Sequence, residues 1–324
     1  MNIKKEMLEK IKKETLLLIQ TSKNDFVISE WGKNGVNSEI IMKEYPKFIR
    51  AVRRLWFYLN LPFKEFWYSP KWKKDIKKYK NFIVHASSIT TKVPKYIKKK
   101  NPNARVILWY WNPVDKRTHP NKINAKYCEK WTFDINDAKE YSMKYNTQYF
   151  FKSIIINTPK IIINDIFFVG ADKGRGPYIN KLYEALKGKN MKLDFNLVMQ
   201  NKKKNKNKYN KEIISDYLPY SIVLQKIAES KSILDIVQNG QSGPTLRTFE
   251  SLFFRKKLIT NNKNLEKFDF YNENNILIID AEKNSDYIND IKSFLKKPYQ
   301  EIDENIINKY DFNNWLIRFF KEDR

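Results

Sequence analysis

The sequence predicts an α/β protein built from two doubly wound domains, each a mainly parallel sheet with helices on both faces. Short apolar segments rich in β-branched and aromatic residues alternate with helical segments along the chain, which is the pattern of βαβ units. At 324 residues the chain is long enough for two domains of ordinary size. Pro159 and scattered asparagines interrupt the alternation, so we predict domains at residues 1–155 and 156–324.

The elements of the first domain follow from hydrophobic periodicity. Strands are predicted at 26–31, 82–85, 105–111, 130–133 and 148–151, and helices at 4–20, 45–59, 93–100 and 135–143. In helix 45–59 we expect one apolar side, formed by Ile49, Val52, Trp56 and Leu59, and we expect Arg50, Arg53 and Arg54 to be largely turned away from it. The aromatic segment 61–72 has two interpretations, a cap over the core or a platform for an apolar or sugar ligand.

The second domain is expected to repeat the architecture. Its strands are predicted at 165–169, 192–199, 233–237, 257–260 and 276–279, and its helices at 178–186, 221–230, 245–254, 287–295 and 306–321. The last helix carries Phe312, Trp315, Phe319 and Phe320 on one face, which suits packing back on the first domain. Two such domains facing each other would form a cleft, and ligands of open α/β sheets bind outside the carboxyl ends of the strands.

The composition is strongly basic, with a formal net charge of +26. Such a charge favours nucleic acid or an anionic membrane surface as a partner. The basic residues are mostly lysines and are spread along the chain, whereas a nucleic-acid surface more often concentrates arginine and aromatic side chains on one element. A general composition bias therefore remains the competing interpretation.

Cysteine and histidine are scarce. Cys128 is the only cysteine and His85 and His119 are the only histidines, which excludes an intrachain disulfide and a multi-Cys or His-rich metal cluster. No apolar run approaches the roughly 20 residues that span a bilayer, and the first residues carry no cleavable signal pattern. We expect a cytoplasmic protein, either free or resting on the inner face of the membrane, and no tightly bound metal.

Two strand–glycine-loop–helix units stand out in the second domain. After the strand at 165–169 comes a loop with Gly170, Asp172, Lys173 and Arg175. After the strand at 233–237 comes a loop with the residues Gln241, Ser242, Gly243, Pro244 and Thr245, and then a helix with Arg247 and Glu250. Free N–H groups and the dipole at a helix N-terminus suit a phosphate, and the basic side chains add permanent charge. The two loops therefore predict a diphosphate site, although neither has the Walker A spacing.

These residues also indicate a family. The segment 241–252, with 256–261 after it, resembles the donor-binding segment of bacterial GT-B glycosyltransferases from lipopolysaccharide, capsule or exopolysaccharide clusters. Segments 60–64, 105–113, 132–134 and 168–175 are similar to the same group. The resemblance implies two Rossmann-like domains, a nucleotide-sugar donor in the second domain and a glycan or lipid-linked acceptor in the first.

The resemblance also implies roles for particular residues. Glu250 would hydrogen-bond the donor ribose or sugar, and Gly243 and Thr245 would take the diphosphate with Lys173 or Arg175. The nucleotide base would lie near Tyr217 and Tyr220. Many retaining relatives carry a second glutamate where this chain has Ser242, so retention or inversion at the anomeric carbon stays open.

An inverting reaction needs a base in the first domain to take a proton from the acceptor hydroxyl. His85, at a strand end, is the first candidate, and Asp134 is the second. Each has a structural alternative, a satisfied histidine for His85 and a helix N-cap for Asp134. Trp111 and Asn112, after the strand at 105–111, are candidate acceptor contacts, with turn formation as the alternative for Asn112.

The sequence predicts a glycosyltransferase, and two other classes remain open. A nucleic-acid or anionic-surface binding protein without catalysis would bind DNA or RNA in a strongly salt-dependent way. A nucleotide-sugar epimerase of the same architecture would use the donor without an acceptor.

Overall fold

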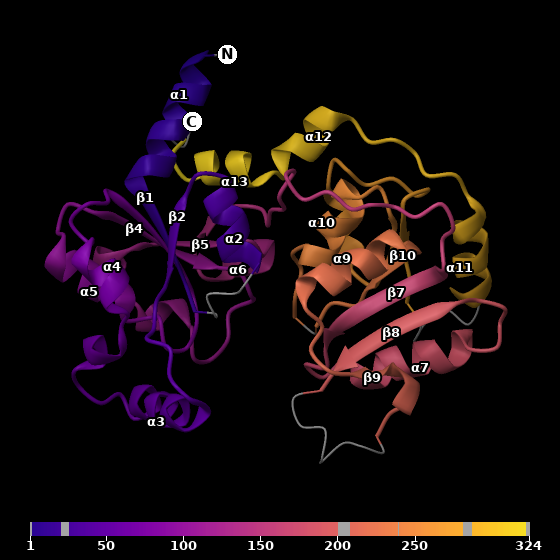
Figure 1. Ribbon diagram of the computed structural model, residues 1–324, viewed down its shortest axis with the longest axis horizontal. Coiled ribbons are helices and arrows are strands. Elements are labelled where there is room, and N and C mark those ends of the chain that lie inside the picture. Colours follow the sequence, from indigo (N-terminus) through magenta and orange to yellow (C-terminus); the bar gives the residue numbers. More distant parts are fainter. Residues whose placement is uncertain (1, 21–25, 200–207, 239, 281–286, 322–324) are drawn as a thin grey trace. The chain divides into compact units, whose positions relative to one another are not determined.

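The computed structural model describes residues 2–20, 26–199, 208–238, 240–280 and 287–321. The chain forms two compact units, one of residues 1–147 with 315–324 and one of residues 148–314. The chain thus passes from the first unit to the second after Thr147, a few residues before the boundary that we predicted, and it returns at Trp315. Both units consist of a sheet flanked by helices (Figure 1).

The first unit contains a six-stranded, all-parallel sheet in the order β2-β1-β3-β4-β5-β6. The strands are β1 Thr15–Ile19, β2 Asn37–Ile40, β3 Asn81–His85, β4 Arg105–Tyr110, β5 Glu129–Thr132 and β6 Lys144–Tyr145. The helices are α1 Asn2–Glu14, α2 Phe26–Lys33, α3 Lys47–Tyr58, α4 Pro70–Lys74, α5 Val93–Lys100 and α6 Ile135–Glu140, with short 3-10 turns at Lys64–Trp67, Pro120–Lys122 and Ala125–Tyr127. Because β1 lies between β2 and β3, the strand order reverses beside β1, and this reversal is where ligands bind in such sheets.

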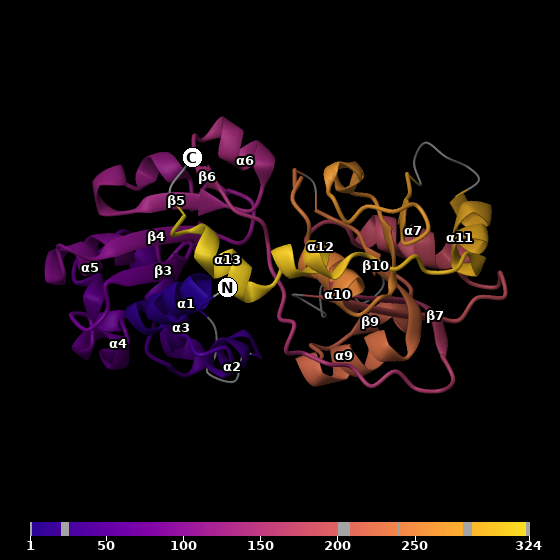
Figure 2. The same ribbon diagram turned by 90° about the horizontal axis from the view of Figure 1, so that it is seen from above.

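Alternate residues of the strands build a core on each face of this sheet, as the period of two requires. One face, with Leu18, Val84 and Leu108, packs against aromatic and aliphatic residues of α4 and α5. On the other face, Trp109 packs against Trp315 with 5.5 Å between ring centroids. Trp315 of α13 (Phe312–Arg318) and Phe319 after it therefore complete the core of the first unit. Figure 2 shows the course of α13.

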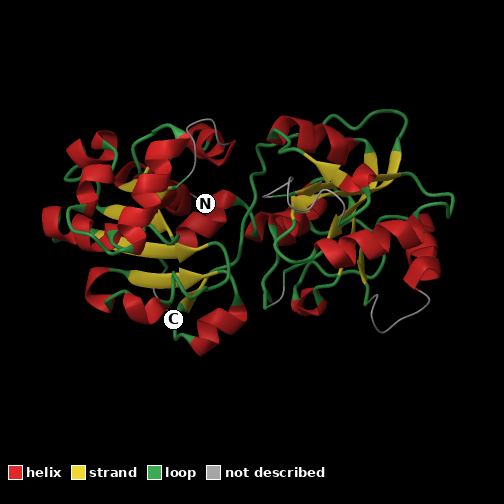
Figure 3. Cartoon of the chain, turned by 90° about the horizontal axis from the view of Figure 1, so that it is seen from below, coloured by secondary structure: helices red, strands yellow, loops and turns green. Residues whose placement is uncertain are grey.

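The second unit repeats the architecture with the order β12-β11-β10-β7-β8-β9, again all parallel. The strands are β7 Asn164–Ala171, β8 Leu193–Val198, β9 Ile214–Ser215, β10 Ser230–Asp235, β11 Lys257–Thr260 and β12 Ile276–Ile278. The helices are α7 Gly176–Leu186, α9 Tyr220–Ala228, α10 Leu246–Phe253, α11 Tyr287–Lys296 and α12 Glu304–Lys309, with 3-10 turns at Lys211–Ile213 and Lys263–Lys267. Helices α7 and α11 cover one face, and α9, α10 and α12 cover the other. Figure 3 shows helices on both sides of the strands. The strand order reverses between β7 and β10.

Most predicted elements are present, and four predictions are wrong. The predicted helix 4–20 ends at Glu14, and residues 15–19 form β1. Residues 26–31 form part of helix α2 and not a strand. Residues 148–151 contribute one β-bridge, Phe150 to Asp311, and not a strand. The predicted helix 306–321 is two helices, α12 and α13.

Helix α3 also differs from its prediction. Ile49 and Trp56 of the predicted apolar side pack against the core, whereas Val52 and Leu59 are exposed. Arg53, which we expected to turn toward solvent, is buried, and its Nη1 donates to the carbonyl oxygen of Lys43 at 3.0 Å. The aromatic segment 61–72 divides: Trp67, Tyr68 and Trp72 lie in the core, and Phe63 and Phe66 are exposed. Across the described ranges, no helix is both long and apolar enough to cross a membrane.

Candidate functional site

The two glycine loops of the second unit lie side by side at one edge of its sheet. One follows β7 and the other follows β10, and these strands are hydrogen-bonded neighbours at the point where the strand order reverses. Arg175, in the first loop, joins them, because its Nη1 donates to the carbonyl oxygen of Ile236 in the second loop. The structure therefore brings the two predicted loops together within one unit.

The first loop is held by Asp172. The Oδ1 of Asp172 accepts from the backbone N–H of Gly174 at 3.2 Å and of Gly176 at 2.9 Å. Lys173 and Gly174 have positive φ values of 45° and 87°, a conformation that glycine adopts without strain and that other residues adopt rarely. Asp172 thus has a structural contact that fixes the loop just before α7 begins.

Arg175 lies directly over Gly170. A Cβ atom at Gly170 would stand 2.3 Å from the Nη2 of Arg175, so any larger residue would displace the guanidinium from this position. The Nε of Arg175 donates to the carbonyl oxygen of Ala171 at 3.0 Å, and its guanidinium lies 5.7 Å from the ring centroid of Phe168. Burial, and secondarily the positive charge of Arg247, lower the pKa of Arg175, while Asp235 opposes this shift. The pKa of Lys173 is lowered by burial and by Arg175.

The second loop is anchored from the end of β11. The side-chain amide of Asn262 donates to the carbonyl oxygens of Ser242 and Gly243, both at 3.3 Å. Asn261 accepts from the N–H of Val237 at 2.9 Å. Ser242, Gly243 and Pro244 are buried, and Gln241 is half-buried and donates to the Gly243 carbonyl oxygen at 3.2 Å. Two asparagines after a neighbouring strand therefore fix the shape of the loop.

Helix α10 begins with a reciprocal cap. Thr245 is the N-cap, and its hydroxyl accepts from the N–H groups of Arg247 and Thr248 while the Thr248 hydroxyl accepts from the N–H of Thr245. Pro244 directly precedes the N-cap. Both hydroxyls donate to the Oδ2 of Asp235, at 2.7 and 3.2 Å. Asp235, the last residue of β10, is almost fully buried, and burial raises its pKa.

Glu250 is the centre of a second network. It is fully buried, and its carboxylate accepts from the guanidinium of Arg247 and, at 2.8 Å, from the hydroxyl of Tyr220. Burial raises the pKa of Glu250, and the charge of Arg247 opposes this shift. Tyr220 is half-buried at the start of α9, whereas Tyr217 is exposed. Glu250 therefore fixes the side chain of Arg247 in this conformation.

The candidate bases of the first unit are both buried. His85 is 2% exposed, and its ring lies between Trp31 and Trp111 at centroid distances of 5.2 and 4.8 Å. Neither ring nitrogen of His85 has a hydrogen-bond partner among the described residues, and burial lowers its pKa to about 3. A base with so low a pKa is poorly matched to take a proton at neutral pH. Catalysis by His85 would require acceptor binding to uncover the ring.

The buried imidazole predicts a specific pH dependence of stability. Because its pKa in the folded state lies below the unfolded value of about 6.5, the unfolded chain binds the proton more tightly, and stability falls as pH drops from 6.5 toward 3. Between pH 6.5 and 5 this one group should remove about 2 kcal/mol. Urea unfolding of His85→Leu at pH 7 and pH 5 should show a pH-dependent loss of stability smaller by that amount than the parent's. An equal loss in His85→Leu and the parent would contradict this account.

The other candidate site residues of the first unit differ in how far they are buried. Asp134 is fully buried and caps α6, accepting from the N–H groups of Asn136 at 3.0 Å and Asp137 at 3.3 Å. Trp111 is half-buried against His85, and Asn112 is exposed just after β4. Cys128 is buried, which raises its pKa to about 12. In the described parts of the chain, no group of three or more His, Cys, Asp or Glu side chains could hold a metal ion.

Sequence reasoning missed Asp235, Asn261 and Asn262, which hold the second loop. For Asp235 a signal was present, because a carboxylate ending an apolar strand faces the same edge as the loop that follows it. The two asparagines sit on another strand, and only the pairing of β10 with β11 brings them to the loop.

No protein-family model and no curated protein matches the chain. Among solved structures, a sucrose-phosphate synthase from Thermosynechococcus elongatus is 10% identical, with a TM-score of 0.57 over 95% of this chain and 97% of that one. MurG from Acinetobacter baumannii is 11% identical, with a TM-score of 0.41 over 94% of each chain. A protein described as a UDP-N-acetylglucosamine 2-epimerase from Listeria monocytogenes is 9% identical, with a TM-score of 0.47 over 95% of each chain. The two parallel six-stranded sheets and the first of these likenesses together show that the chain has the GT-B fold, with two Rossmann-like units.

Proposed function

We propose that the protein is a glycosyltransferase that moves a sugar from a nucleotide-sugar donor to a glycan or lipid-linked acceptor. The observation that carries the proposal is the pair of glycine loops at the point of strand reversal in the second unit, where Arg175 spans both. A crevice at such a point is where open α/β sheets bind nucleotides. The GT-B fold is compatible with this use and does not by itself establish it.

The chemistry is displacement of a nucleoside diphosphate from the anomeric carbon of the donor sugar. Negative charge grows on the leaving phosphate, and fixed cations and helix N-termini stabilise that charge. Arg175, Lys173 and Arg247 supply the cations, and α10 supplies the helix N-terminus. We propose that these groups neutralise the leaving group without a tightly bound metal, so that transfer continues in the presence of a chelator.

We propose that the main role of Glu250 is to hold the side chain of Arg247 in place. Its carboxylate is covered by Arg247 and Tyr220, so a direct hydrogen bond to the donor ribose or sugar would have to replace one of these partners. We therefore assign Glu250 as a positioning residue whose charge orients Arg247 toward the loops. The nucleotide base is placed near the exposed Tyr217 and the half-buried Tyr220.

The acceptor is assigned to the first unit, with Trp111 and Asn112 as contacts and His85 or Asp134 as the base if the reaction inverts. The sequence resemblance of segment 241–252 supports a place in bacterial surface polysaccharide synthesis. The reaction would then occur in the cytoplasm, where nucleotide sugars serve as donors.

The outer face of α3 supports an additional contact with an anionic membrane surface. Phe48 and Leu55 are 79% and 56% exposed, and Val52 and Leu59 lie on the same side of the helix. Lys47 and Arg54 of the same helix are also exposed. An apolar stripe flanked by cations has the chemistry of a helix that lies in the lipid interface.

This contact predicts binding to vesicles that contain phosphatidylglycerol. The double variant Phe48→Ser/Leu55→Ser should bind them about thirtyfold more weakly, since about 2 kcal/mol of apolar burial is lost. A matched control is Ile161→Ser/Ile163→Ser, which removes two exposed apolar side chains from the second unit. Sedimentation with vesicles measures the difference, and equal binding by the two double variants would refute the assignment of α3.

Product analysis tests the proposed function. The purified protein is incubated with a panel of nucleotide sugars, with and without a mixture of glycan and lipid-linked acceptors, in buffer containing a chelator. A transferase releases free nucleoside diphosphate in an acceptor-dependent way. An epimerase converts the donor without acceptor, and a nucleic-acid binding protein leaves every donor unchanged and binds DNA or RNA with a steep salt dependence.

A further inference from the structure

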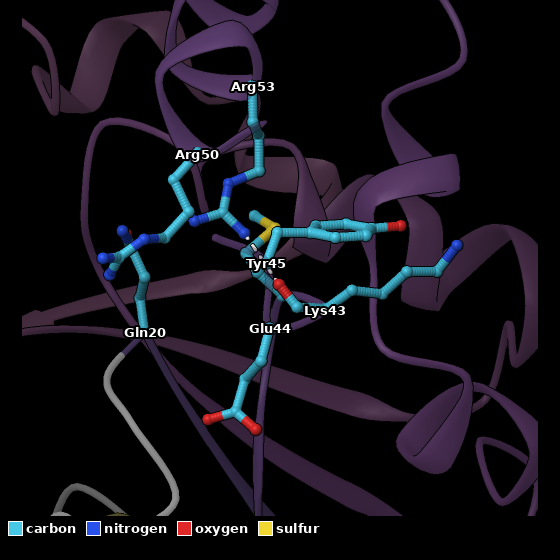
Figure 4. Close-up of a pocket in the computed structure, with 7 residues that line it drawn as sticks. Gln20, Lys43, Glu44, Tyr45, Arg50 and Arg53 are labelled. Carbon is cyan, nitrogen blue, oxygen red and sulfur yellow. Dashed lines mark hydrogen bonds between the residues drawn. The ribbon is translucent and has the colours of Figure 1, made fainter. Parts of the chain in front are cut away.

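A cavity of about 400 Å³ lies in the first unit, where the chain leaves β1 and β2 (Figure 4). Its lining residues are Gln20, Met42, Lys43, Glu44, Tyr45, Arg50 and Arg53. Gln20 directly follows β1, and its Oε1 accepts from the hydroxyl of Ser87, just after β3, at 2.5 Å. The cavity is therefore adjacent to the strand reversal of the first unit, at the carboxyl edge of the sheet where ligands bind.

The buried positive charge of Arg53 determines which ligands this cavity can accept. The residue is 7% exposed, and Nη1 donates to the Lys43 carbonyl oxygen at 3.0 Å. The Nε is buried and has no hydrogen-bond partner within the described residues. Burial, together with the positive charges of Arg50 and Arg54, lowers the pKa of Arg53. A buried cation with an unused donor is costly unless an anion compensates it.

The surroundings do not supply that anion. Neither Arg50 nor Arg53 forms an ion pair within the part of the chain that the structure describes. The carboxylate of Glu44 points away from both guanidinium groups (Figure 4). The ammonium of Lys43 lies over the Phe66 ring, 4.2 Å from its centroid. Two guanidinium groups thus line one cavity and have no carboxylate partner there.

We infer that this cavity binds an anionic group, a phosphate or a carboxylate, of the acceptor substrate. Guanidinium groups match the planar or tetrahedral oxygens of such groups with paired, charge-assisted hydrogen bonds. The volume suits one charged sugar residue or one phosphate ester and its neighbour. The side-chain amide of Gln20 adds a polar group to the lining. The assignment to the acceptor rests on the proposed function, whereas the anion site itself belongs to the first unit and needs only the cavity.

The matched pair Arg50→Ala and Arg54→Ala tests the inference. Both arginines are exposed on α3 and both changes remove one charge, but only Arg50 lines the cavity. The probes are inorganic phosphate and glucuronate, each titrated against the parent and the variants at constant ionic strength with chloride as the reference salt. Loss of one charge-assisted contact should weaken binding about tenfold in Arg50→Ala, and Arg54→Ala should bind like the parent. Arg53→Lys keeps the positive charge but removes the paired N–H donors of the guanidinium. This variant should therefore also bind the anions more weakly.

The outcomes separate the possible sources of the effect. A preference for phosphate over glucuronate identifies a phosphorylated acceptor, and the reverse identifies an acidic sugar. Equal weakening in Arg50→Ala and Arg54→Ala would mean that only net charge acts, and it would overturn the inference. Loss of the phosphate response in Arg175→Ala, with no change in Arg50→Ala, would place all binding in the second unit and overturn it as well. If the transferase proposal alone fails, nucleoside diphosphates do not bind and the Arg50-dependent response remains.

Discussion

Replacing Glu250 with glutamine is expected to lower the rate of sugar transfer about a hundredfold while the protein stays folded. The Glu250 carboxylate is the fixed partner of Arg247, and removing its charge releases a cation that is needed at the leaving phosphate. Loss of one such stabilising group costs about 10²–10³ in turnover. Glutamine still offers a carbonyl oxygen to Tyr220, so the free energy of unfolding should fall by only about 1 kcal/mol.

Alanine at Glu250 should behave differently from glutamine. It leaves Arg247 without its partner in a site where Glu250 itself has no exposed surface, and breaking a buried pair in this way costs about 3–5 kcal/mol. The matched control is Glu266→Gln, an exposed glutamate of the same unit. Turnover and the free energy of unfolding in urea are measured for Glu250→Gln, Glu250→Ala and Glu266→Gln. If the folded Glu250→Gln variant turned over as fast as the parent, the proposed role of Glu250 in sugar transfer would be wrong.

The second large effect is expected at Arg175. The Arg175→Ala variant should bind nucleoside diphosphates at least about a hundredfold more weakly, because it loses a charge-assisted contact with the phosphates and the hydrogen bond that joins the two loops. The guanidinium has five N–H donors, and within the described residues the carbonyl oxygens of Ala171 and Ile236 accept from two of its nitrogens. The other donors remain for the ligand.

Two further variants separate charge from geometry at this position. Arg175→Lys restores a charge without the paired contacts and should recover only part of the affinity. Gly170→Ala should weaken binding without changing the charge, because its Cβ would occupy the space of the Arg175 side chain. Lys189→Ala, at an exposed turn of the same unit, is the matched control. Isothermal titration of the nucleotide gives the affinities, and equal losses in Arg175→Ala and Lys189→Ala would show that Arg175 contributes only net charge.

The sequence predicted the second unit well because its signals are local. A strand, a loop with glycine and a helix follow each other directly at β7 and at β10, and neighbouring parallel strands place such loops at one edge. Arg175 lies between the two loops, and its role as a phosphate ligand stays a prediction. The burial of Glu250 could not be predicted, because it depends on Tyr220 of another helix.

The errors in the first unit have a physical cause as well. Residues 16–19 are apolar at every position, and all five residues of β1 are buried, so the hydrophobic pattern of this segment does not distinguish a strand from a continuation of the helix before it. Arg53 was placed on the solvent side because charged residues are rarely buried without a partner. Its hydrogen bond to Lys43 depends on the path of the chain after β2, which local patterns do not specify.

The central claim is that the second unit holds a nucleoside diphosphate between its two glycine loops. Calorimetric titration of the purified protein with UDP, GDP, ADP, CDP and TDP, in a chelator and at physiological salt, tests it most directly. We expect at least one nucleotide to bind with 1:1 stoichiometry to the parent and to Lys189→Ala, and to bind far more weakly to Arg175→Ala. Binding of no nucleotide, or equal binding by Arg175→Ala and the parent, would contradict it.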